Sequence, residues 1–272
     1  MNRSRSDESG TWHYGLLARW WAEFNVAEPH ELDYWRGAIK RHGEPAIDLG
    51  CGTGRFLVPL RAEGFDIDGT DVSEDMLEQV RAKSSGLESQ PALFPQALHE
   101  LELPRLYRTM FMCGVFGIGG RRDHDREALR RIRRHLEPGG ALLIIQVLPN
   151  NDGQDVESWA EWLPGHHPDL PGPWPEAGNR RRCADGDELE LRSRAAAFDS
   201  LEQFEVSDIR ARLWHEGQVI REEEYSLRAC IYFPQELVLM LHDAGFADVV
   251  IEGNYTGEPA RQDEGTVIFV AR

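Results

Sequence analysis

A glycine-rich turn between a short apolar run and an amphipathic segment is the feature that most constrains the fold of this chain. The run Pro45–Leu49 has the composition of a buried strand, and it leads directly into Gly50–Gly54 (GCGTG). Glycine has no Cβ, so such a turn lets the backbone approach a ligand closely. A helix is expected from about Arg55 to Glu63. Strand, glycine turn and helix in this order predict a nucleotide site at the edge of a parallel sheet.

An acidic residue in the right place supports a nucleotide ligand. Asp71 lies about 20 positions beyond the turn, where the next predicted strand, Phe65–Gly69, has ended, and a carboxylate there can accept hydrogen bonds from ribose hydroxyls. A dinucleotide-binding fingerprint would need a third glycine where this chain has Arg55. This difference weakens the hypothesis of a nicotinamide cofactor without excluding it. The Gly-Lys-Ser/Thr ending of a phosphate-binding loop is absent.

Strand and helix signals alternate through much of the chain. Further segments of strand type are Ala92–Phe94, Tyr107–Cys113 and Ala141–Leu148, with a helix over Asp123–Leu136. A helix that opens at Pro234 and strands over Ala247–Ile251 and Thr266–Ala271 complete the pattern. Strands that alternate with helices predict a parallel sheet covered on both faces.

The alternation is interrupted after Pro149. Proline, glycine and tryptophan are frequent from there to about Asp187, and three long segments of β type follow: Glu188–Phe198, Leu201–Trp214 and Val219–Ile231. The last two are joined by residues 215–218 (HEGQ), which suit a hairpin turn. This stretch is expected to form an antiparallel insertion.

The predicted fold class is therefore α/β: a Rossmann-like seven-stranded sheet with helices on both faces and an antiparallel β insertion after the fifth strand. We expect a disordered tail at residues 1–11 and one nucleotide-binding domain made of residues 12–149 and 232–272, with cap helices near its N-terminus. Residues 150–231 are expected to form a lid and a β insertion that cap the substrate.

Four short motifs resemble those of one enzyme family in the same order. They are Ala46–Gly54 (AIDLGCGTG), Asp71–Leu77 (DVSEDML), Leu136–Leu142 (LEPGGAL) and Ala244–Phe246 (AGF). Together they resemble the first motif, the second motif, the turn into the fifth strand and the antiparallel edge of the class I S-adenosylmethionine-dependent methyltransferases. The resemblance covers residues 45–148 and 233–272, and it implies S-adenosyl-L-methionine as the cofactor.

The resemblance also implies roles for residues of the glycine turn and its surroundings. Residues of the turn, Gly50, Cys51, Gly52 and Gly54, would lie beside the methionine and ribose part of the cofactor. Asp48 would hold the turn or reach the cofactor's amino group through water, and Asp71 would bind the ribose hydroxyls. Cys113 would lie at the end of the fourth strand, where the methyl group and the substrate meet.

The adenine contacts are less well marked by the sequence. The resemblance implies that Val72 and Met76 pack near the adenine. Many members of the family have an acidic residue after the third strand that contacts the adenine amino group, and this chain has Pro95–His99 (PQALH) there instead. The backbone of Ala97 or Leu98, or the side chain of Gln96, is expected to make that contact.

Composition narrows the partners and the compartment. The formal net charge of −17 disfavours binding to nucleic acid, because a polyanion would be repelled. A basic stretch from Arg121 to Arg134 is expected to be a solvated helix face, with an anionic partner as the alternative.

Four scattered cysteines predict neither a disulfide framework nor a zinc site, and no metal ligand cluster is evident. Ala141–Leu148 is too short to span a bilayer, so we expect a cytoplasmic protein, a monomer or homodimer that does not bind membranes.

The expected reaction is methyl transfer to nitrogen or oxygen of a small-molecule metabolite. Motifs of DNA amino-methyltransferases and cytosine-C5 enzymes are absent, which favours a small substrate. Tyr14 and Glu223 are the candidate catalytic residues, and His13, His124, His166 and His167 are further candidate bases. The segment Trp159–Trp174 is a candidate lid. A nicotinamide-dependent oxidoreductase and a non-catalytic cofactor-binding regulator remain alternatives.

Overall fold

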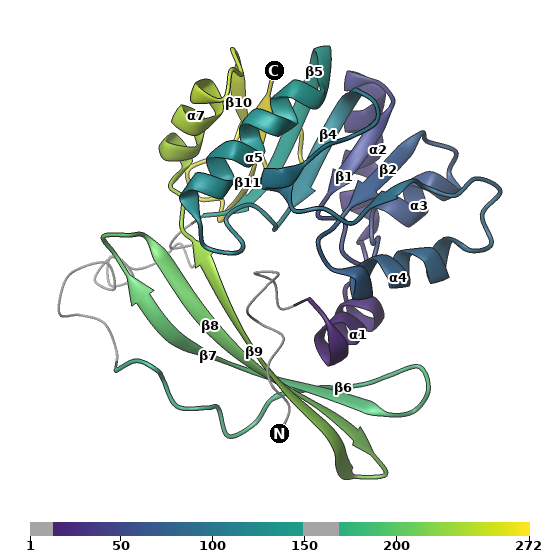
Figure 1. Ribbon diagram of the computed structural model, residues 1–272, viewed down its shortest axis with the longest axis vertical. Coiled ribbons are helices and arrows are strands. Elements are labelled where there is room, and N and C mark those ends of the chain that lie inside the picture. Colours follow the sequence, from purple (N-terminus) through teal and green to yellow (C-terminus); the bar gives the residue numbers. More distant parts are fainter. Residues whose placement is uncertain (1–12, 149–168) are drawn as a thin grey trace. The chain divides into compact units, whose positions relative to one another are not determined.

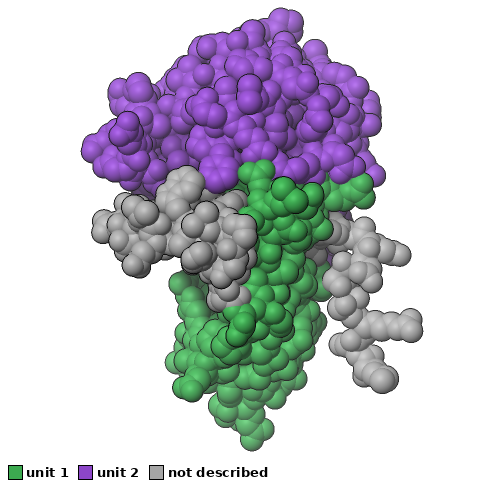
Figure 2. Space-filling view, turned by 90° about the vertical axis from the view of Figure 1, so that its left-hand side faces the viewer, with its two compact units in different colours: residues 1–26, 117–121, 155–231 green, residues 27–116, 122–154, 232–272 purple. Residues whose placement is uncertain are grey.

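The computed structural model describes residues 13–148 and 169–272, which form two compact units (Figure 2). Of these residues, unit 1 contains 13–26, 117–121 and 169–231, and unit 2 contains 27–116, 122–148 and 232–272. The division differs from the predicted domains at the N-terminus, because residues 13–26 group with the β insertion. The predicted tail at 1–11 and most of the candidate lid lie outside the described residues.

Unit 2 is built on a seven-stranded sheet with the order β10-β11-β5-β4-β1-β2-β3 (Figure 1). The strands are β1 Ala46–Leu49, β2 Ile67–Thr70, β3 Leu93–Phe94, β4 Tyr107–Cys113, β5 Leu136–Val147, β10 Val249–Gly253 and β11 Thr266–Ala271. Strands β1 to β5 pair in parallel, whereas β11 is antiparallel to both of its neighbours. The predicted Rossmann-like sheet is thus confirmed, including its antiparallel edge.

Helices cover both faces of this sheet. They are α2 Pro29–His42, α3 Leu57–Ala62, α4 Glu74–Ser84, α5 Arg122–His135 and α7 Pro234–Asp243, with a 3-10 turn, η1, at Leu98–Glu100. Figure 1 shows α5 and α7 over one face and α2 over the other. Trp35 of α2 is fully buried and stacks on Phe111 of β4, with ring centroids 4.3 Å apart. This packing fixes α2, and therefore its first turn, against the centre of the sheet.

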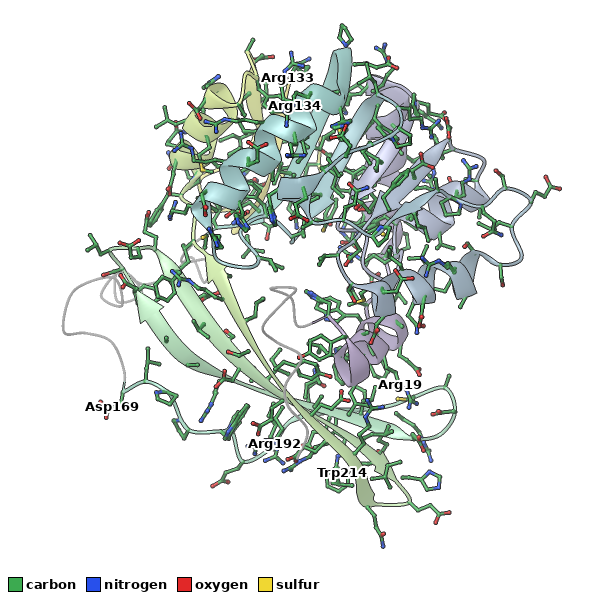
Figure 3. The ribbon with its side chains drawn as sticks, in the orientation of Figure 1. Arg19, Arg133, Arg134, Asp169, Arg192 and Trp214 are labelled. Atoms are coloured by element: carbon green, nitrogen blue, oxygen red, sulfur yellow. The ribbon has the colours of Figure 1, made fainter. Side chains whose placement is uncertain are left out.

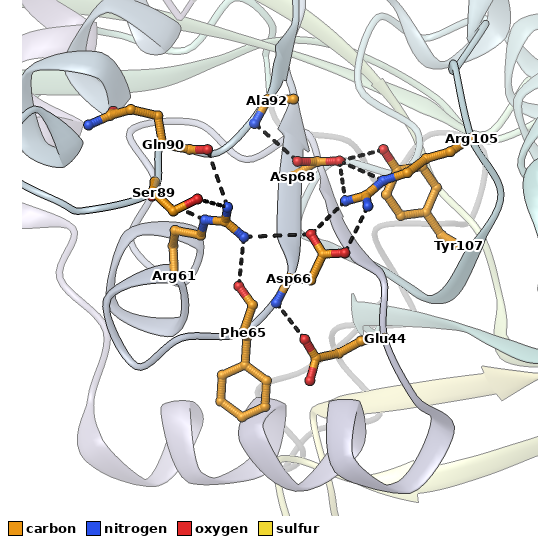
Figure 4. Close-up of polar contacts among 10 residues, drawn as sticks. All are labelled: Glu44, Arg61, Phe65, Asp66, Asp68, Ser89, Gln90, Ala92, Arg105 and Tyr107. Atoms are coloured by element: carbon orange, nitrogen blue, oxygen red, sulfur yellow. Dashed lines mark hydrogen bonds and ion pairs between the residues drawn. The ribbon is translucent and has the colours of Figure 1, made fainter.

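A polar network holds the amino end of β2 (Figure 4). Asp68 is buried, and its carboxylate accepts hydrogen bonds from Tyr107 Oη at 2.7 Å and from Arg105 Nη2 at 2.7 Å. The same guanidinium donates to both oxygens of Asp66, at 2.7 and 2.8 Å. Buried carboxylates need such donors, so this network fixes β2, the strand directly before Asp71.

Unit 1 is a four-stranded antiparallel sheet in the order β6-β7-β8-β9 with one helix, α1 Gly15–Phe24, against it. The strands are β6 Asn179–Arg182, β7 Glu188–Asp199, β8 Phe204–His215 and β9 Gln218–Cys230. A cluster of apolar side chains from α1 and the sheet includes Leu16, Leu17, Leu189 and Tyr225. The predicted insertion and its hairpin turn at residues 216–217 are confirmed.

Tryptophan and arginine side chains pack together at the sheet of unit 1. Trp214 and Arg192, labelled in Figure 3, both donate to the buried carboxylate of Glu190, at 2.9 and 2.7 Å. Trp174 is the C-terminal end of the candidate lid. The guanidinium groups of Arg194 and Arg210 lie over its ring, at 4.5 and 4.4 Å from the centroid. Trp174 is therefore engaged by the sheet of its own unit.

Three local differences from the sequence prediction have physical causes. Strand β6 was not predicted, because its four residues (NRRR) are all exposed and lack an apolar pattern. Pro138–Gly140 was predicted as a turn and lies within β5, but the residues bulge from the ladder between the pairs Tyr107–Leu136 and Thr109–Ala141. Helix α3 begins two residues later than expected, because the glycine turn extends further.

The basic stretch on α5 is largely paired. Arg126 and Arg130 donate to Asp243 at the end of α7, and Arg131 pairs with Glu127. Arg133 donates to the carbonyl of Gly245. These pairings support the prediction of a solvated helix face. In the described part of the chain, no helix has both the length and the apolar character needed to cross a membrane.

Candidate functional site

The glycine turn follows β1 and has a backbone that favours glycine. Gly50 has φ 71°, and a Cβ there would lie 2.6 Å from Cγ2 of Val115, which follows β4. Gly52 has φ 53°, but a Cβ there would meet no atom within 4 Å. Gly50 is thus needed for packing as well as conformation, whereas Gly52 faces open space. A ligand can approach the backbone at Gly52.

Asp71 bridges the glycine turn and the start of α4. Its Oδ2 accepts from the backbone N–H of Gly52 at 2.9 Å, and its Oδ1 accepts from that of Ser73 at 2.8 Å. Burial raises the pKa of Asp71, while the backbone N–H groups of Ser73 and Gly52 oppose that rise. Each carboxylate oxygen has a second lone pair. Asp71 can therefore hold the turn and still accept hydrogen bonds from a ligand.

Asp48 is the second carboxylate of the site, and it is 3 % exposed. Among the described residues its side chain makes no hydrogen bond, although the charges of Arg55 and Asp71 act on it. Burial raises the pKa of Asp48 to about 8, with Asp71 adding to the rise and Arg55 opposing it. A buried carboxyl group without a donor is costly, so Asp48 fits a ligand that supplies one.

On the predicted adenine side, the candidate residues differ in accessibility. Val72 is 38 % exposed directly after Asp71, whereas Met76 is buried within α4. Gln96 is occupied by its own loop: its Oε1 accepts from Glu102 N at 2.7 Å and its Nε2 donates to Glu102 O at 3.1 Å. Ala97 and Leu98 lie at the start of η1 and are partly exposed. Of the three alternatives named for the adenine amino group, the backbone of Ala97 or Leu98 is thus favoured over Gln96.

The two cysteines of the site differ in surroundings. Cys51 is buried under the turn, where its Sγ would lie 3.0 Å from a Cβ on Gly69 of β2. Burial raises the pKa of Cys51 well above its usual value, so the thiol stays protonated and acts as a packing group. Cys113 ends β4, and its Sγ accepts from Arg55 Nη2 at 3.3 Å. Burial raises the pKa of Cys113 too.

A polar cluster that the sequence analysis did not identify joins three distant segments at the end of β4. Arg55 donates to both oxygens of Glu31, each at 3.2 Å, and its guanidinium lies 4.0 Å from the ring centroid of Phe56. Tyr255, which follows β10, lies with its hydroxyl 3.7 Å from Cys113 Sγ. The residues come together only in the fold, and no spacing in the sequence marks them.

The two predicted catalytic residues, Tyr14 and Glu223, lie in unit 1. Glu223 Oε2 accepts from the backbone N–H of Leu16 at 2.7 Å, in the first turn of α1, and from the hydroxyl of Tyr225. Tyr14 packs its ring 4.9 Å from that of Tyr225, and its carbonyl accepts from the same hydroxyl. These contacts anchor α1 to β9. A catalytic role for either residue stays a prediction.

The structure describes two of the four candidate histidine bases, His13 and His124. His13 packs 5.9 Å from Trp21, and burial lowers the pKa of His13 to about 4. His124 stacks on His99 of η1 at 3.7 Å. His166 and His167 lie outside the described residues. The part of the chain that the structure describes contains no group of three or more His, Cys, Asp or Glu side chains suited to a metal ion.

Comparison with known proteins identifies the segment that contains the glycine turn. Residues 47–142, from β1 into β5, match the family model described as a methyltransferase domain. A putative methyltransferase of Geobacillus sp. strain WCH70 is 33% identical over 139 residues, which are 48% of this chain and 56% of that relative. The chain thus aligns with only about half the length of this curated relative. The matched segment contains Asp48, Gly50, Gly52, Asp71 and Cys113.

Solved structures extend the similarity over most of the chain. The sugar N-methyltransferase KedS8 from Streptoalloteichus sp. ATCC 53650 has a TM-score of 0.66 and 19% identity, covering 96% of this chain and 97% of that structure. The SAM-bound amino pentose methyltransferase CalS10 from Micromonospora echinaspora has a TM-score of 0.59 and 16% identity, covering 90% and 93%. At these identities the structural match establishes the fold, and the sequence match establishes the domain. Residues 47–142 are thus a methyltransferase domain by sequence, and the chain shares the fold of these methyltransferases over most of its length.

Proposed function

We propose that this protein transfers the methyl group of S-adenosyl-L-methionine to a nitrogen or oxygen atom of a small molecule. The observation that carries the proposal is the pair of carboxylates around the glycine turn. Asp71 is held by the N–H groups of Gly52 and Ser73 with acceptor capacity left for a ribose. Asp48 is buried, and none of the described residues donates a hydrogen bond to its side chain.

The residues of this site fit the cofactor. Asp71 would accept hydrogen bonds from the ribose hydroxyls, Val72 would pack on the adenine, and Asp48 would face the ammonium group of the amino acid end. The open space at Gly52 leaves room for the backbone to approach that ligand. When bound, S-adenosylmethionine supplies an already activated methyl group. The chain has to align the acceptor atom with it, and such orientation can contribute about 7–11 kcal/mol.

A small-molecule acceptor is favoured by charge and by the similar structures. With a net charge of −17, the chain would on average repel a polyanionic substrate. The arginines of α5 that could form a basic surface are paired with Asp243 and Glu127. KedS8 and CalS10, which share the fold, are a sugar N-methyltransferase and an amino pentose methyltransferase. An amine or hydroxyl group on a polar metabolite is therefore the acceptor to test first.

The nicotinamide alternative is disfavoured by the position where a third glycine would be needed. Arg55 stands there, and its guanidinium is fixed by both oxygens of Glu31. A side chain of this size, held in place, occupies the position where a dinucleotide site needs close approach of the backbone to a pyrophosphate.

A methyl-transfer screen tests the proposal. The full chain is incubated with methyl-labelled S-adenosylmethionine and a panel of amino sugars, amines and hydroxylated metabolites, and labelled products are separated by chromatography. We expect at least one acceptor to be labelled by the wild type and far less by Asp71→Ala. Tight cofactor binding without any labelled product across the panel would favour the non-catalytic regulator instead.

A further inference from the structure

The glycine turn at residues 50–54 has a backbone that is costly to order. Gly50, Gly52 and Gly54 all have positive φ, at 71°, 53° and 76°. Glycine loses more conformational freedom on ordering than any other residue. Where the fold already orders such a turn, ligand binding does not have to, and the ligand binds more tightly. The contacts that hold the turn in the free protein therefore bear on cofactor affinity.

The two ends of the turn are held by different means. At its start, Cys51 N donates to the carbonyl of Thr70 at 2.8 Å, and Asp71 accepts from Gly52 N at 2.9 Å. At its exit, Phe56 is the N-cap residue of α3, and its side chain has no oxygen or nitrogen with which to cap the helix. Helix starts without a capping side chain need other partners, so the exit needs a different anchor.

Arg55 anchors the exit of the turn to α2 and to the end of β4. It directly follows Gly54, and its guanidinium donates to both oxygens of Glu31, each at 3.2 Å. The same group donates to Cys113 Sγ at 3.3 Å and lies 4.0 Å from the ring centroid of Phe56. The side chains of Arg55 and Glu31 are only 19 % and 10 % exposed. A shielded bidentate pair restricts a guanidinium more than a surface contact does.

Glu31 is itself fixed by the first turn of α2. Its Oε2 accepts from Glu28 N at 2.8 Å in the capping box of that helix. Trp35, fully buried and stacked on Phe111, holds α2 on the sheet. All of these residues lie in unit 2. Arg55 is thus held by a helix that lies outside the four short cofactor motifs.

A second Arg–Glu pair joins the same two helices away from the turn. Arg36 of α2 donates to both oxygens of Glu63, at 2.6 and 2.7 Å, and Glu63 is the C-cap residue of α3. This pair has shorter hydrogen bonds than the Glu31–Arg55 pair, but it lies at the opposite end of α3 from the glycine turn. Variants of the two pairs can therefore separate the joining of α2 to α3 from the ordering of the turn.

We propose that Arg55, held by Glu31, is a positioning residue that orders the glycine turn before the cofactor binds. The inference rests on the proposed function, since it concerns the same cofactor site. Loss of either member of the pair leaves the exit of the turn less ordered in the free protein, and the ligand then has to order it.

Titration calorimetry with S-adenosylhomocysteine, the product that methyl transfer leaves, tests the effect on binding without a measurement of activity. Arg55→Gln should raise the dissociation constant about tenfold, and Glu31→Gln should raise it in the same direction. The double variant Glu31→Gln/Arg55→Gln should bind no more weakly than Arg55→Gln, because the two side chains act as one unit. Arg55→Lys should recover part of the affinity, since it keeps the charge without the bidentate geometry.

Arg36→Gln is the matched control, because it removes the other pair between the same helices. Its dissociation constant should stay within about twofold of wild type, even if its melting temperature falls as far as that of Arg55→Gln. Arg81→Gln, in an exposed pair with Glu74 on α4, controls for the loss of a surface charge.

Hydrogen exchange followed by mass spectrometry tests the ordering itself. In free Arg55→Gln, the peptide that covers residues 50–57 should exchange faster than in wild type, and S-adenosylhomocysteine should restore its protection. In Arg36→Gln the same peptide should exchange at the wild-type rate.

Three results would overturn the inference while leaving the proposed function standing. One is wild-type affinity in Glu31→Gln, whatever Arg55→Gln does, because the pair would then not position the turn. The second is an equal loss of affinity in Arg36→Gln and Arg55→Gln. The third is unchanged exchange of the turn peptide in Arg55→Gln. By contrast, failure of the folded wild type to bind S-adenosylhomocysteine would overturn the proposed function, and this inference with it.

Discussion

Asp71 combines a structural contact and a proposed ligand contact in one carboxylate. Its oxygens accept from Gly52 N and Ser73 N, which ties the glycine turn to α4. Asp71→Asn should weaken S-adenosylhomocysteine binding by about 1.5–3 kcal/mol, because a charged acceptor for the ribose is lost. Titration calorimetry measures this, with Glu78→Gln, an exposed acid on α4, as the control. An unchanged dissociation constant would remove Asp71 from the site.

Asp48 should leave a mark on the pH dependence of stability. Its pKa is raised from 3.8 to about 8 in the fold, chiefly by burial, so the folded protein keeps a proton that the unfolded chain has lost. The stability linked to this proton is fully present below the pKa that Asp48 has in the unfolded chain. It is lost as the pH rises through the pKa that Asp48 has in the folded protein. Between those values the free energy of unfolding should fall by up to about 1.4 kcal/mol per pH unit relative to Asp48→Asn.

Urea denaturation of wild type and Asp48→Asn at several pH values checks this prediction. The difference in unfolding free energy between the two proteins should change steadily from about pH 5 to pH 7 and level off above about pH 8. Parallel curves would mean that Asp48 is ionised throughout in the folded protein.

At the scale of elements, the N-terminus of α1 depends on β9. Tyr14, at the N-cap, makes no side-chain capping bond, and Glu223 and Tyr225 supply acceptors to Leu16 N and Leu17 N instead. Glu223→Ala should therefore lower stability by about 1–2 kcal/mol, as the loss of a helix cap does. Glu223→Gln keeps an acceptor and should cost less.

The same pair of variants separates anchoring from catalysis. Anchoring alone predicts that Glu223→Gln retains most of the methyl-transfer rate, whereas a catalytic carboxylate predicts a large loss of rate at unchanged melting temperature. Thermal unfolding and the labelled-methyl assay, run on both variants, distinguish the two roles. A loss of rate in Glu223→Gln at wild-type stability would support the catalytic prediction.

Strand β2 depends on Arg105, which joins Asp66 and Asp68 at its amino end. The pKa of Asp66 is held low mainly by its hydrogen bonds with Arg105. Arg105→Gln should lower the free energy of unfolding by about 1–3 kcal/mol, since the buried carboxylate of Asp68 loses charged donors. Arg81→Gln should stay within about 0.5 kcal/mol of wild type. Equal urea midpoints for the two variants would contradict this assignment.

On the scale of the whole molecule, the sequence predicted those helices, strands and turns that are marked by a local pattern of residues. Apolar runs, the glycine turn and the Pro-initiated helices marked the sheet, its insertion and the nucleotide site. Grouping of α1 with the insertion was missed, because it depends on which apolar surface the helix packs against. Strand β6 was missed because an exposed edge strand of arginines has no apolar period.

The candidate cofactor site could be predicted from the sequence only where its residues lie close together in the chain. Asp48, the glycines and Asp71 lie within one continuous strand-turn-helix-strand segment, so their spacing alone indicates a site. Glu31 pairs with Arg55 from α2, and Tyr255 lies beside Cys113 from the turn after β10. Only the folded sheet brings these segments together. Gln96 was one of three candidates for the adenine contact, and its side chain is occupied by Glu102.

Calorimetric titration of the full chain with S-adenosylhomocysteine, with NAD as the comparison ligand, tests the central claim most directly. We predict binding of S-adenosylhomocysteine with a dissociation constant of about micromolar order, near 8 kcal/mol of binding free energy, and no heat from NAD. If folded protein gave no binding signal with S-adenosylhomocysteine, the assignment of the cofactor site would be contradicted. Saturable binding of NAD in its place would point to a nicotinamide-dependent oxidoreductase.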